Sequence, residues 1–259
     1  TWHRNHKLIE GGENSIHTTE LITDDAIRFI REKRDNPFFL YLPYTAVHTP
    51  LDERGKFYDQ PTQLDRRNPN RWKNESDIPW FNDPLGKIQQ EKDPEKRLFL
   101  AALHHLDHAI GRVIDTLKGQ NLYDHTLILF SSDNGPQVNW PGNAYPDDLK
   151  LTDFNQPIPM RGKKIDVYEG GIKVPGFAVW PQKIKPQQID ASMHIVDWFP
   201  TIAQVIAYQT PSNIGWDGVD QSKTILMGTN SPERDFYWVQ SNHRRAVRHD
   251  DWKVVCYSR

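Results

Sequence analysis

Short apolar runs alternate with amphipathic helical patterns over the first 208 residues of this chain, and this alternation restricts the fold more than any other feature. The run 38–42, Phe-Phe-Leu-Tyr-Leu, is uninterrupted, which is typical of a strand buried on both faces of a sheet. The helical patterns repeat apolar residues at intervals of three and four. The runs span 38–42, 126–131 and 175–180, and the helical patterns span about 18–34, 94–118 and 198–208. We therefore expect an α/β fold with a mixed, largely parallel sheet flanked by helices.

Local signals indicate where these helices begin and which side they bury. Thr18 or Thr19 is expected to cap the first helix, and Asp197 the third. In the second helix, His104 and His108 lie one turn apart and could bind a metal. No HExxH motif accompanies them, so ordinary helix-surface residues are the favoured interpretation. The expected core stripe of this helix consists of Leu103, Leu106, Ile110, Val113 and Leu117.

The chain is expected to contain most of one large domain and the start of a smaller one. Residues 1–209 carry the alternating pattern, interrupted at 52–96 by a polar stretch that we interpret as a surface insertion. Residues 210–259 have shorter segments, with strands expected at 235–239 and 252–257. These are interpreted as the start of a small C-terminal antiparallel subdomain.

Composition excludes several classes of partner. The 32 basic and 34 acidic residues give a net charge of −2, so no global field favours nucleic acid or an anionic membrane. No apolar run approaches the roughly 18 residues that a membrane span needs. A single cysteine excludes an intrachain disulfide. Any affinity for anions must therefore be local.

The segment 131–135, Ser-Ser-Asp-Asn-Gly, follows an expected strand directly. Ligands of open α/β sheets bind at the carboxyl ends of the strands. The carboxylate of Asp133 and the amide of Asn134 offer hard oxygen ligands, which suit Ca²⁺ or Mg²⁺. The alternative is an ordinary turn, because Asp-Asn-Gly is also common turn chemistry.

Two further clusters could bind an anion. His48 follows the first apolar run and could act as a general acid or donate to an anion, although a lone histidine is more often a surface residue. Arg161, Lys163 and Lys164 place three cations within four residues, beside glycines. They favour a local anion site, with a solvated basic turn as the alternative.

Seven short motifs follow one another in a fixed order. They are His48-x-Pro50; Leu106-Asp107 with Gly111-Arg112-Val113; Ser132-Asp133-Asn134-Gly135; Arg161-Gly162-Lys163-Lys164 with Tyr168-Glu169-Gly170-Gly171; Asp197-x-x-Pro200-Thr201; Asp217-Gly218; and Ala246-Val247-Arg248 with Asp251-Trp252-Lys253. This order closely resembles that of the type I sulfatase family, in the alkaline phosphatase superfamily. The resemblance covers nearly the whole chain except 52–96, and it implies an alkaline phosphatase-like fold.

The resemblance also implies roles for individual residues. Asp133 and Asn134 match the family's later pair of calcium ligands, with Mg²⁺ a less favoured metal. His48 matches the histidine that contacts the sulfate ester and can protonate the leaving oxygen. Lys164 matches the lysine that holds the sulfate, Lys163 is its neighbouring alternative, and Arg161 is expected to assist in binding the substrate.

One part of the family pattern is missing from this sequence. The family's nucleophile is a cysteine or serine in C/S-x-P-x-R, which is converted to formylglycine. Cys256 is followed by Tyr257-Ser258-Arg259, and Ser231-Pro232 has the wrong spacing. We expect the nucleophile, with the first calcium-binding acids, in an N-terminal region outside this chain. The chain is thus interpreted as a fragment that needs the remainder of its catalytic domain as a partner.

The leading hypothesis is a sulfuric ester hydrolase that uses calcium and formylglycine in the complete protein and acts on a sulfated carbohydrate. A phosphonate or phosphate ester hydrolase of the same superfamily is one alternative. A non-catalytic carbohydrate-binding remnant is another, favoured by the missing nucleophile. The resemblance implies a periplasmic, extracellular or lysosomal location.

Overall fold

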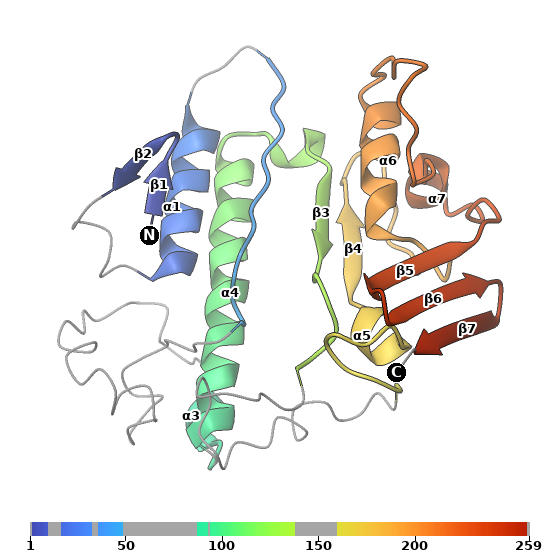
Figure 1. Cartoon of the computed structure of the whole chain (residues 1–259). Helices are drawn as coiled ribbons and strands as arrows, with labels where there is room; N and C mark the ends of the chain where they lie inside the picture. The colour runs from blue at the N-terminus through green and yellow to red at the C-terminus, as the bar shows by residue number, and fades with distance from the viewer. Residues whose placement is uncertain are drawn as a thin grey trace. The chain divides into compact units, whose positions relative to one another are not determined.

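The computed structural model describes residues 2–9, 17–32, 36–48, 87–92, 94–137 and 160–257. These fall into two compact units. The described part of the first unit ends at Tyr123, and that of the second unit consists of 124–137 and 160–257 (Figure 1). Within the described residues, no helix combines the length and the apolarity needed to cross a membrane.

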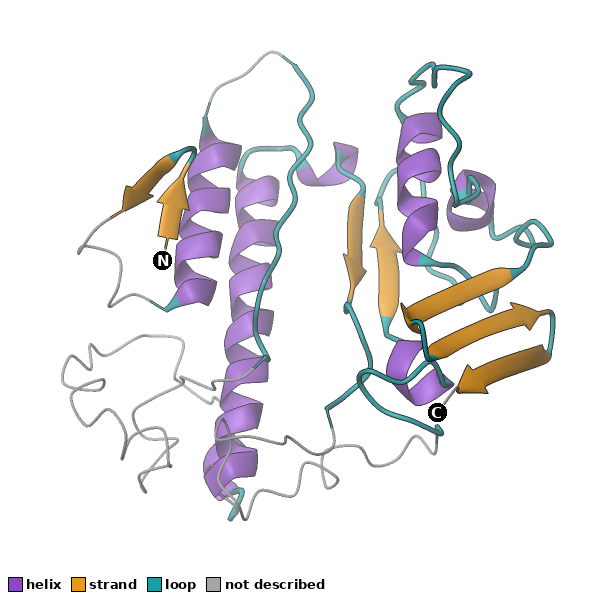
Figure 2. Cartoon of the chain, viewed as in Figure 1, coloured by secondary structure: helices purple, strands orange, loops and turns teal. Residues whose placement is uncertain are grey.

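The first unit is built on two long helices. A hairpin of β1 (Trp2–Arg4) and β2 (Lys7–Ile9) precedes α1 (Thr18–Arg31), and a short α3 (Lys87–Gln90) precedes α4 (Pro94–Gly119). Helices α1 and α4 pack against each other, as Figure 2 shows. Both predicted helices are confirmed. Most of the predicted insertion at 52–96 lies outside the described residues.

The cap of α1 differs from the prediction. The side chain of His17, rather than Thr18 or Thr19, accepts a hydrogen bond from the backbone N–H of Thr19 at 3.2 Å. Thr19 is instead buried within the first turn of the helix. The imidazole satisfies one of the donors that the first turn leaves open, a role for which Ser, Thr, Asp and Asn are the usual residues.

The buried face of α4 is also rotated relative to the predicted stripe. Leu103 is 45% exposed, whereas His105 is fully buried and small residues fill the contact with α1. The buried residues of α4 are Ala101, Ala102, His105, Ala109, Val113, Thr116 and Leu117. Alanines allow close approach of the two helices, and they carry a weaker hydrophobic signal than leucines, so the prediction followed the leucines.

His105 is buried because it has a charged partner on the facing helix. Its Nε2 donates to Glu20 Oε1 at 2.7 Å, and Arg112 Nη1 donates to Glu20 Oε2 at 2.6 Å. Burial raises the pKa of Glu20, but the hydrogen bonds and charges of His105 and Arg112 outweigh it and hold the pKa below its ordinary value. Removing one member of such a buried pair costs about 3 to 5 kcal/mol, so this network ties α1 to α4.

The segment predicted as a doubly buried strand at 38–42 is extended but is not part of a described sheet. Phe39 and Tyr41 are 72% and 74% exposed. Phe38 on the other side packs edge-on against Phe29, and Tyr44 shares a 3.0 Å hydrogen bond with Thr23. Contacts within this unit therefore cover one side of the segment, and the prediction of burial on both faces is wrong for the described structure.

The second unit begins with a two-stranded sheet. After the 3₁₀ helix η3 (Tyr123–His125), which spans the boundary of the units, β3 (Ile128–Ser131) pairs with β4 (Gly176–Val179). Both strands were predicted, but their pairing is antiparallel, and every strand pair among the described residues is antiparallel. The predicted parallel pairing is not found in this part of the chain. Along the chain, α5 (Glu169–Ile172) comes between β3 and β4.

Asp197 has a different role from the predicted helix cap. It closes the 3₁₀ helix η5 (Ile195–Asp197) and precedes α6 (Trp198–Val205), but it makes no side-chain cap of α6. Its fully buried carboxylate accepts from His194 N at 2.7 Å, Val219 N at 3.1 Å and Arg234 Nη2 at 2.6 Å. Three donors compensate the cost of burying this charge.

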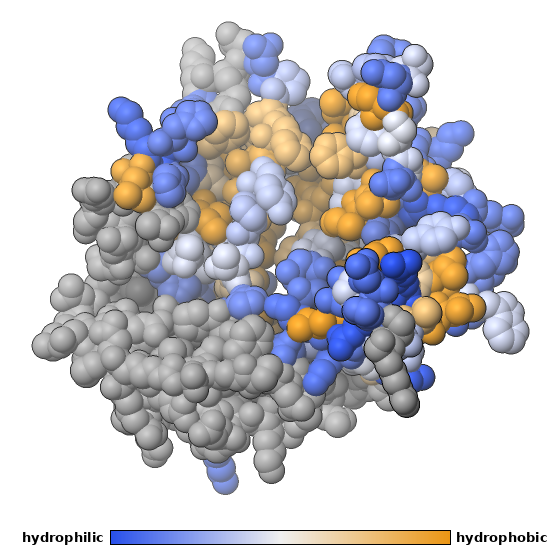
Figure 3. Space-filling view, in the orientation of Figure 1, coloured by the Kyte–Doolittle hydropathy of each residue, from blue (hydrophilic) through white to orange (hydrophobic). Residues whose placement is uncertain are grey.

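The C-terminal part is a three-stranded antiparallel sheet, which confirms the antiparallel prediction. After α7 (Ser222–Met227), it consists of β5 (Phe236–Ser241), β6 (Arg244–His249) and β7 (Trp252–Tyr257), with β6 in the middle. Exposed apolar side chains lie on β5 and β7, and hydrophobic and hydrophilic surface alternate over this region in Figure 3.

Candidate anion and metal site

The loop that follows β3 carries Asp133 and Asn134. Ser132 N donates to Pro175 O at 3.3 Å, which holds the start of the loop beside the segment that enters β4. The Asn134 side chain is half-buried, and its Nδ2 donates to Gly135 O at 2.8 Å. Because the amide nitrogen is used in this way, the amide oxygen is left as an acceptor. The Asp133 side chain is exposed.

The second predicted cluster lies on the loop 160–168. Arg161 is exposed, and its guanidinium lies 3.9 Å from the centre of the Tyr168 ring. Lys163 and Lys164 are half-buried. The backbone N–H of Lys163 donates to Asp166 Oδ2 at 3.1 Å, which fixes the turn that follows. The three cations thus project from one short, hydrogen-bonded loop.

Two backbone hydrogen bonds join this loop to the loop after β3. Gly135 N donates to Gly171 O at 2.8 Å, and Lys164 N donates to Pro136 O at 2.8 Å. Gly170 N donates to Arg161 O at 2.8 Å and closes the basic loop on itself. The structure therefore brings Asp133 and Asn134 into one assembly with Arg161 and Lys164, although these residues are about 30 positions apart in the sequence.

This assembly requires glycine at the contact points. A Cβ on Gly135 would collide with the carbonyl of Gly170, and a Cβ on Gly170 would collide with the carbonyl of Gly162. A Cβ on Gly171 would meet the carbonyl oxygens of Lys163 and Asp166. From the sequence pattern, the glycines beside the basic loop were expected only as neighbours of the cations. Their role is close packing of backbone on backbone.

Ile165, next to Lys164, has a strained backbone. Its φ is +79°, a region that a β-branched residue rarely occupies and that costs on the order of 1 to 3 kcal/mol. The strain is held by contacts on both sides: Lys164 N bonds to Pro136 O, and Arg244 Nη1 donates to Ile165 O at 3.5 Å. Strain of this kind is concentrated at functional sites.

His48, the remaining predicted site residue, belongs to the first unit. It is exposed at the end of the extended segment 36–48, where its backbone N–H donates to Thr45 O at 2.8 Å. Tyr44, anchored to Thr23, fixes this segment four residues earlier. Because the two units are separate, the place of His48 beside Lys164 stays a prediction.

The oxygen ligands fit a hard cation only in part. A carboxylate and an amide oxygen suit Ca²⁺, which takes about six to eight oxygen ligands. In the described ranges, no group of three or more His, Cys, Asp or Glu side chains is arranged to hold a metal ion. Asp133 and Asn134 can therefore contribute to a metal site but do not make a complete one.

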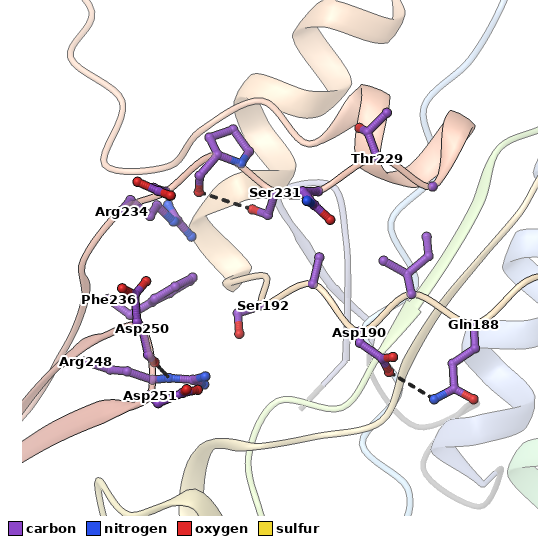
Figure 4. A pocket seen from close by; sticks show the side chains of 16 residues that line it. Gln188, Asp190, Ser192, Thr229, Ser231, Arg234, Phe236, Arg248, Asp250 and Asp251 are labelled. Carbon is purple, nitrogen blue, oxygen red and sulfur yellow. Dashed lines mark hydrogen bonds between the residues drawn. The ribbon is translucent and has the colours of Figure 1, made fainter.

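A separate cleft of about 510 Å³ lies between the segment 188–192, the loop 228–234 and the β6–β7 turn (Figure 4). Two hydrogen bonds join polar groups of its lining: Gln188 donates to Asp190 at 3.0 Å, and Arg248 Nε donates to Asp250 O at 2.6 Å. None of the predicted site residues is among the described residues that line it. The loops that carry Asp133 and Lys164 are therefore the better candidate site.

Sequence reasoning missed several residues that build this site. Pro136 and Gly171 act through backbone atoms, which no side-chain pattern reveals. Glu169 and Lys253 form an ion pair across 84 positions, with Lys253 Nζ at 3.2 and 3.0 Å from the two carboxylate oxygens. The only sequence signal for this ion pair was that Glu169 and Lys253 both occur in the ordered motifs.

The geometry fixes a basic loop against the loop that carries Asp133 and Asn134. The sulfatase family profile matches residues 5–208, so this chain belongs to the sulfatase family. It is 30% identical over 256 residues to mouse arylsulfatase J, a match that covers 95% of this chain and 36% of the relative. It is 27% identical over 253 residues to the N-acetylgalactosamine-6-O-sulfatase of Bacteroides thetaiotaomicron, covering 95% of this chain and 42% of the relative.

Solved structures agree on the fold. The crystal structure of Ps i-CgsB in complex with k-i-k-neocarrahexaose superposes with a TM-score of 0.68 at 23% identity, over 97% of this chain and 48% of that one. A sulfatase from Bacteroides fragilis superposes with a TM-score of 0.61 at 22% identity, over 93% and 49%. The chain thus spans less than half the length of these relatives.

We predict that Gly135→Ala destabilises the second unit by about 2 kcal/mol or more, because the new methyl group must displace the Gly170 carbonyl. The free energy of unfolding in urea measures this change. Gly111→Ala in α4 is the matched control, because a Cβ there meets nothing within 4 Å and alanine favours a helix by roughly 0.5 to 1 kcal/mol. Equal stability of the two variants would contradict the packing argument.

Proposed function

We propose that the full-length protein carrying this chain hydrolyses sulfate esters. The observation that carries the proposal is the pair of backbone hydrogen bonds, Gly135 to Gly171 and Lys164 to Pro136, which fix a basic loop against a loop of oxygen ligands. Membership of the sulfatase family supports the reaction class.

The basic loop can bind and polarise the ester. A sulfate ester carries one negative charge, and more charge develops on the leaving oxygen as the S–O bond breaks. Lys164 is proposed to hold the sulfate, with Arg161 assisting at the exposed edge of the loop. Fixed cations stabilise developing charge most when they do not have to reorganise, and the tethered backbone of Lys164 meets that condition.

His48 is proposed to donate a proton to the leaving oxygen. General acid catalysis of this kind contributes about 10²- to 10⁴-fold. The exposure of His48 at the end of the 36–48 segment leaves its side chain accessible to a substrate.

Asp133 and Asn134 are proposed as two ligands of a Ca²⁺ ion. Bound calcium would supply positive charge that polarises a sulfate oxygen, and formylglycine, as the family resemblance implies, would supply the nucleophile. The carboxylate of Asp133 and the free amide oxygen of Asn134 support this assignment.

We propose a sulfated carbohydrate as the substrate. Among the relatives, one is named an N-acetylgalactosamine-6-O-sulfatase, and the superposed Ps i-CgsB was solved with a neocarrahexaose. Both names support a sugar for this protein.

The test compares hydrolysis of aryl sulfates and aryl phosphates by the full-length protein, using leaving groups of different pKa. We expect kcat/KM to be higher for sulfates, and we expect His48→Ala to lower the rate about 10²-fold or more for poor leaving groups and much less for good ones. The physical reason is that a good leaving group departs without a proton.

A faster reaction with phosphates would identify a phosphate or phosphonate ester hydrolase instead. Binding of a sulfated oligosaccharide without turnover of any ester would favour a non-catalytic carbohydrate-binding protein. Equal losses for all leaving groups in His48→Ala would reduce His48 to a sulfate-binding residue.

We predict that Lys164→Ala lowers kcat/KM for an aryl sulfate by about 10²-fold, the order expected for the loss of one charge-stabilising donor. Lys163→Ala is the matched control, since it removes the adjacent charge and should change kcat/KM little. The opposite pattern would show that Lys163 holds the sulfate.

We predict that Asp133→Ala weakens Ca²⁺ binding and abolishes sulfate-ester hydrolysis, because one charged ligand is lost. Isothermal titration of the calcium-free protein with Ca²⁺ measures the first effect independently of activity. Asp124→Ala, which removes an exposed carboxylate from the same unit, is the control. Unchanged calcium affinity in Asp133→Ala would refute the ligand assignment.

A further inference from the structure

The C-terminal sheet contacts the basic loop through strand β7. Along β7, Trp252 and Val254 are exposed, whereas Lys253 and Val255 between them are half-buried. This alternation gives the strand one outward face and one face toward the rest of the unit. The Lys253 side chain is only 12% exposed. A lysine is rarely covered to this extent unless it has a partner.

The partner of Lys253 is Glu169, the first residue of α5. Lys253 Nζ lies 3.2 and 3.0 Å from the two carboxylate oxygens, and 4.3 Å from the centre of the Trp238 ring on β5. Burial lowers the pKa of Lys253 below its ordinary value, and the charge of Arg248 on β6 lowers it further. The Glu169 carboxylate raises the pKa and offsets part of this shift. Lys253 is thus a cation enclosed by a ring and a carboxylate.

Glu169 is joined through its neighbours to both loops of the candidate site. Gly170 N bonds to Arg161 O, and Gly171 O accepts from Gly135 N. A Cβ on either glycine would collide with carbonyl groups of the loop 160–168, so the backbone of α5 lies in close contact with that loop. A displacement of Glu169 would therefore be transmitted to the cations on one side and to the oxygen ligands on the other.

A second set of contacts from the same sheet holds the part of the loop that lies between Lys164 and Glu169. Tyr257 Oη donates to Asp166 Oδ1 at 3.3 Å, and its ring stacks on Tyr168 at 5.6 Å. Arg244 Nη1 lies 3.8 Å from Asp166 Oδ1 and also bonds to the strained Ile165. The C-terminal sheet thus contacts the residues that follow Lys164, from Ile165 to Glu169.

We propose that Lys253 is a positioning residue of the site: by pairing with Glu169, it fixes α5 and hence the geometry of the Arg161–Lys164 loop relative to Asp133 and Asn134. It acts through Glu169 and the glycines without touching the substrate. The proposal rests on the proposed function for its catalytic consequence, but its effect on anion binding can be measured without turnover.

An ion pair of this kind could also serve stability alone. Exposed pairs contribute little to stability, and Glu169 is 38% exposed, so a large catalytic effect with a small stability effect distinguishes the two roles. Small displacements of positioned groups reduce rates strongly, since a shift of about 1 Å can cost about 10²-fold.

The experiment uses the full-length protein with Lys253→Met, which keeps an unbranched apolar stem against Trp238 and removes the charge. Lys253→Arg keeps the charge, and Lys173→Met removes an exposed lysine just after α5 as the control. Three quantities are measured for each: the Tm, the Kd for inorganic sulfate by isothermal titration, and kcat and KM for an aryl sulfate.

We expect Lys253→Met to weaken sulfate binding and to lower kcat by roughly tenfold or more with a Tm close to that of the parent. Lys253→Arg should recover a large part of both sulfate binding and kcat, and Lys173→Met should match the parent in both. If Lys253→Met lowers the Tm but leaves the sulfate Kd and kcat unchanged, or changes nothing, the positioning role is wrong. A parent protein that binds sulfate but hydrolyses no sulfate ester would overturn the proposed function, and the sulfate Kd of Lys253→Met would still test the positioning role.

Discussion

The hydrogen bond from Gly135 N to Gly171 O is the contact on which the candidate site depends. It joins the loop after β3 to the loop that leads into β4, and it forms because neither residue carries a side chain in the contact. Together with the hydrogen bond from Lys164 N to Pro136 O, it brings the loops that carry Asp133 and Lys164 together. Backbone–backbone contacts of this closeness hold the two loops together without using charged side chains as the contact.

Electrostatics in this chain are local. A net charge of −2 gives no general attraction for anions, yet Arg161, Lys163 and Lys164 lie within one loop. Two carboxylates lie close to this loop: Asp166 accepts from Lys163 N, and Glu169 pairs with Lys253. The C-terminal sheet therefore acts as part of the site, since its side chains hold the carboxylates that stabilise the loop.

The helices could be predicted from the sequence more reliably than the sheet. Helices α1 and α4 were expected within a few residues of their ends, because amphipathic spacing and terminal signals are local. The antiparallel pairing of β3 with β4 could not be predicted, because pairing depends on residues far apart in the chain. The burial of His105 depended similarly on Glu20, which lies 85 residues away on α1.

The sequence by itself determined the chemistry of the candidate site: a carboxylate and an amide after a strand, a cluster of cations, and the ordered motifs that indicate the sulfatase family. It also determined the positions at which glycine leaves the backbone without a side chain. Only the tertiary structure decided that Asp133–Asn134 and Arg161–Lys164 share one assembly, that Ile165 is strained, and that Lys253 reaches Glu169. The physical reason is that these contacts join distant backbone and side-chain atoms, and their geometry exists only after the chain has folded.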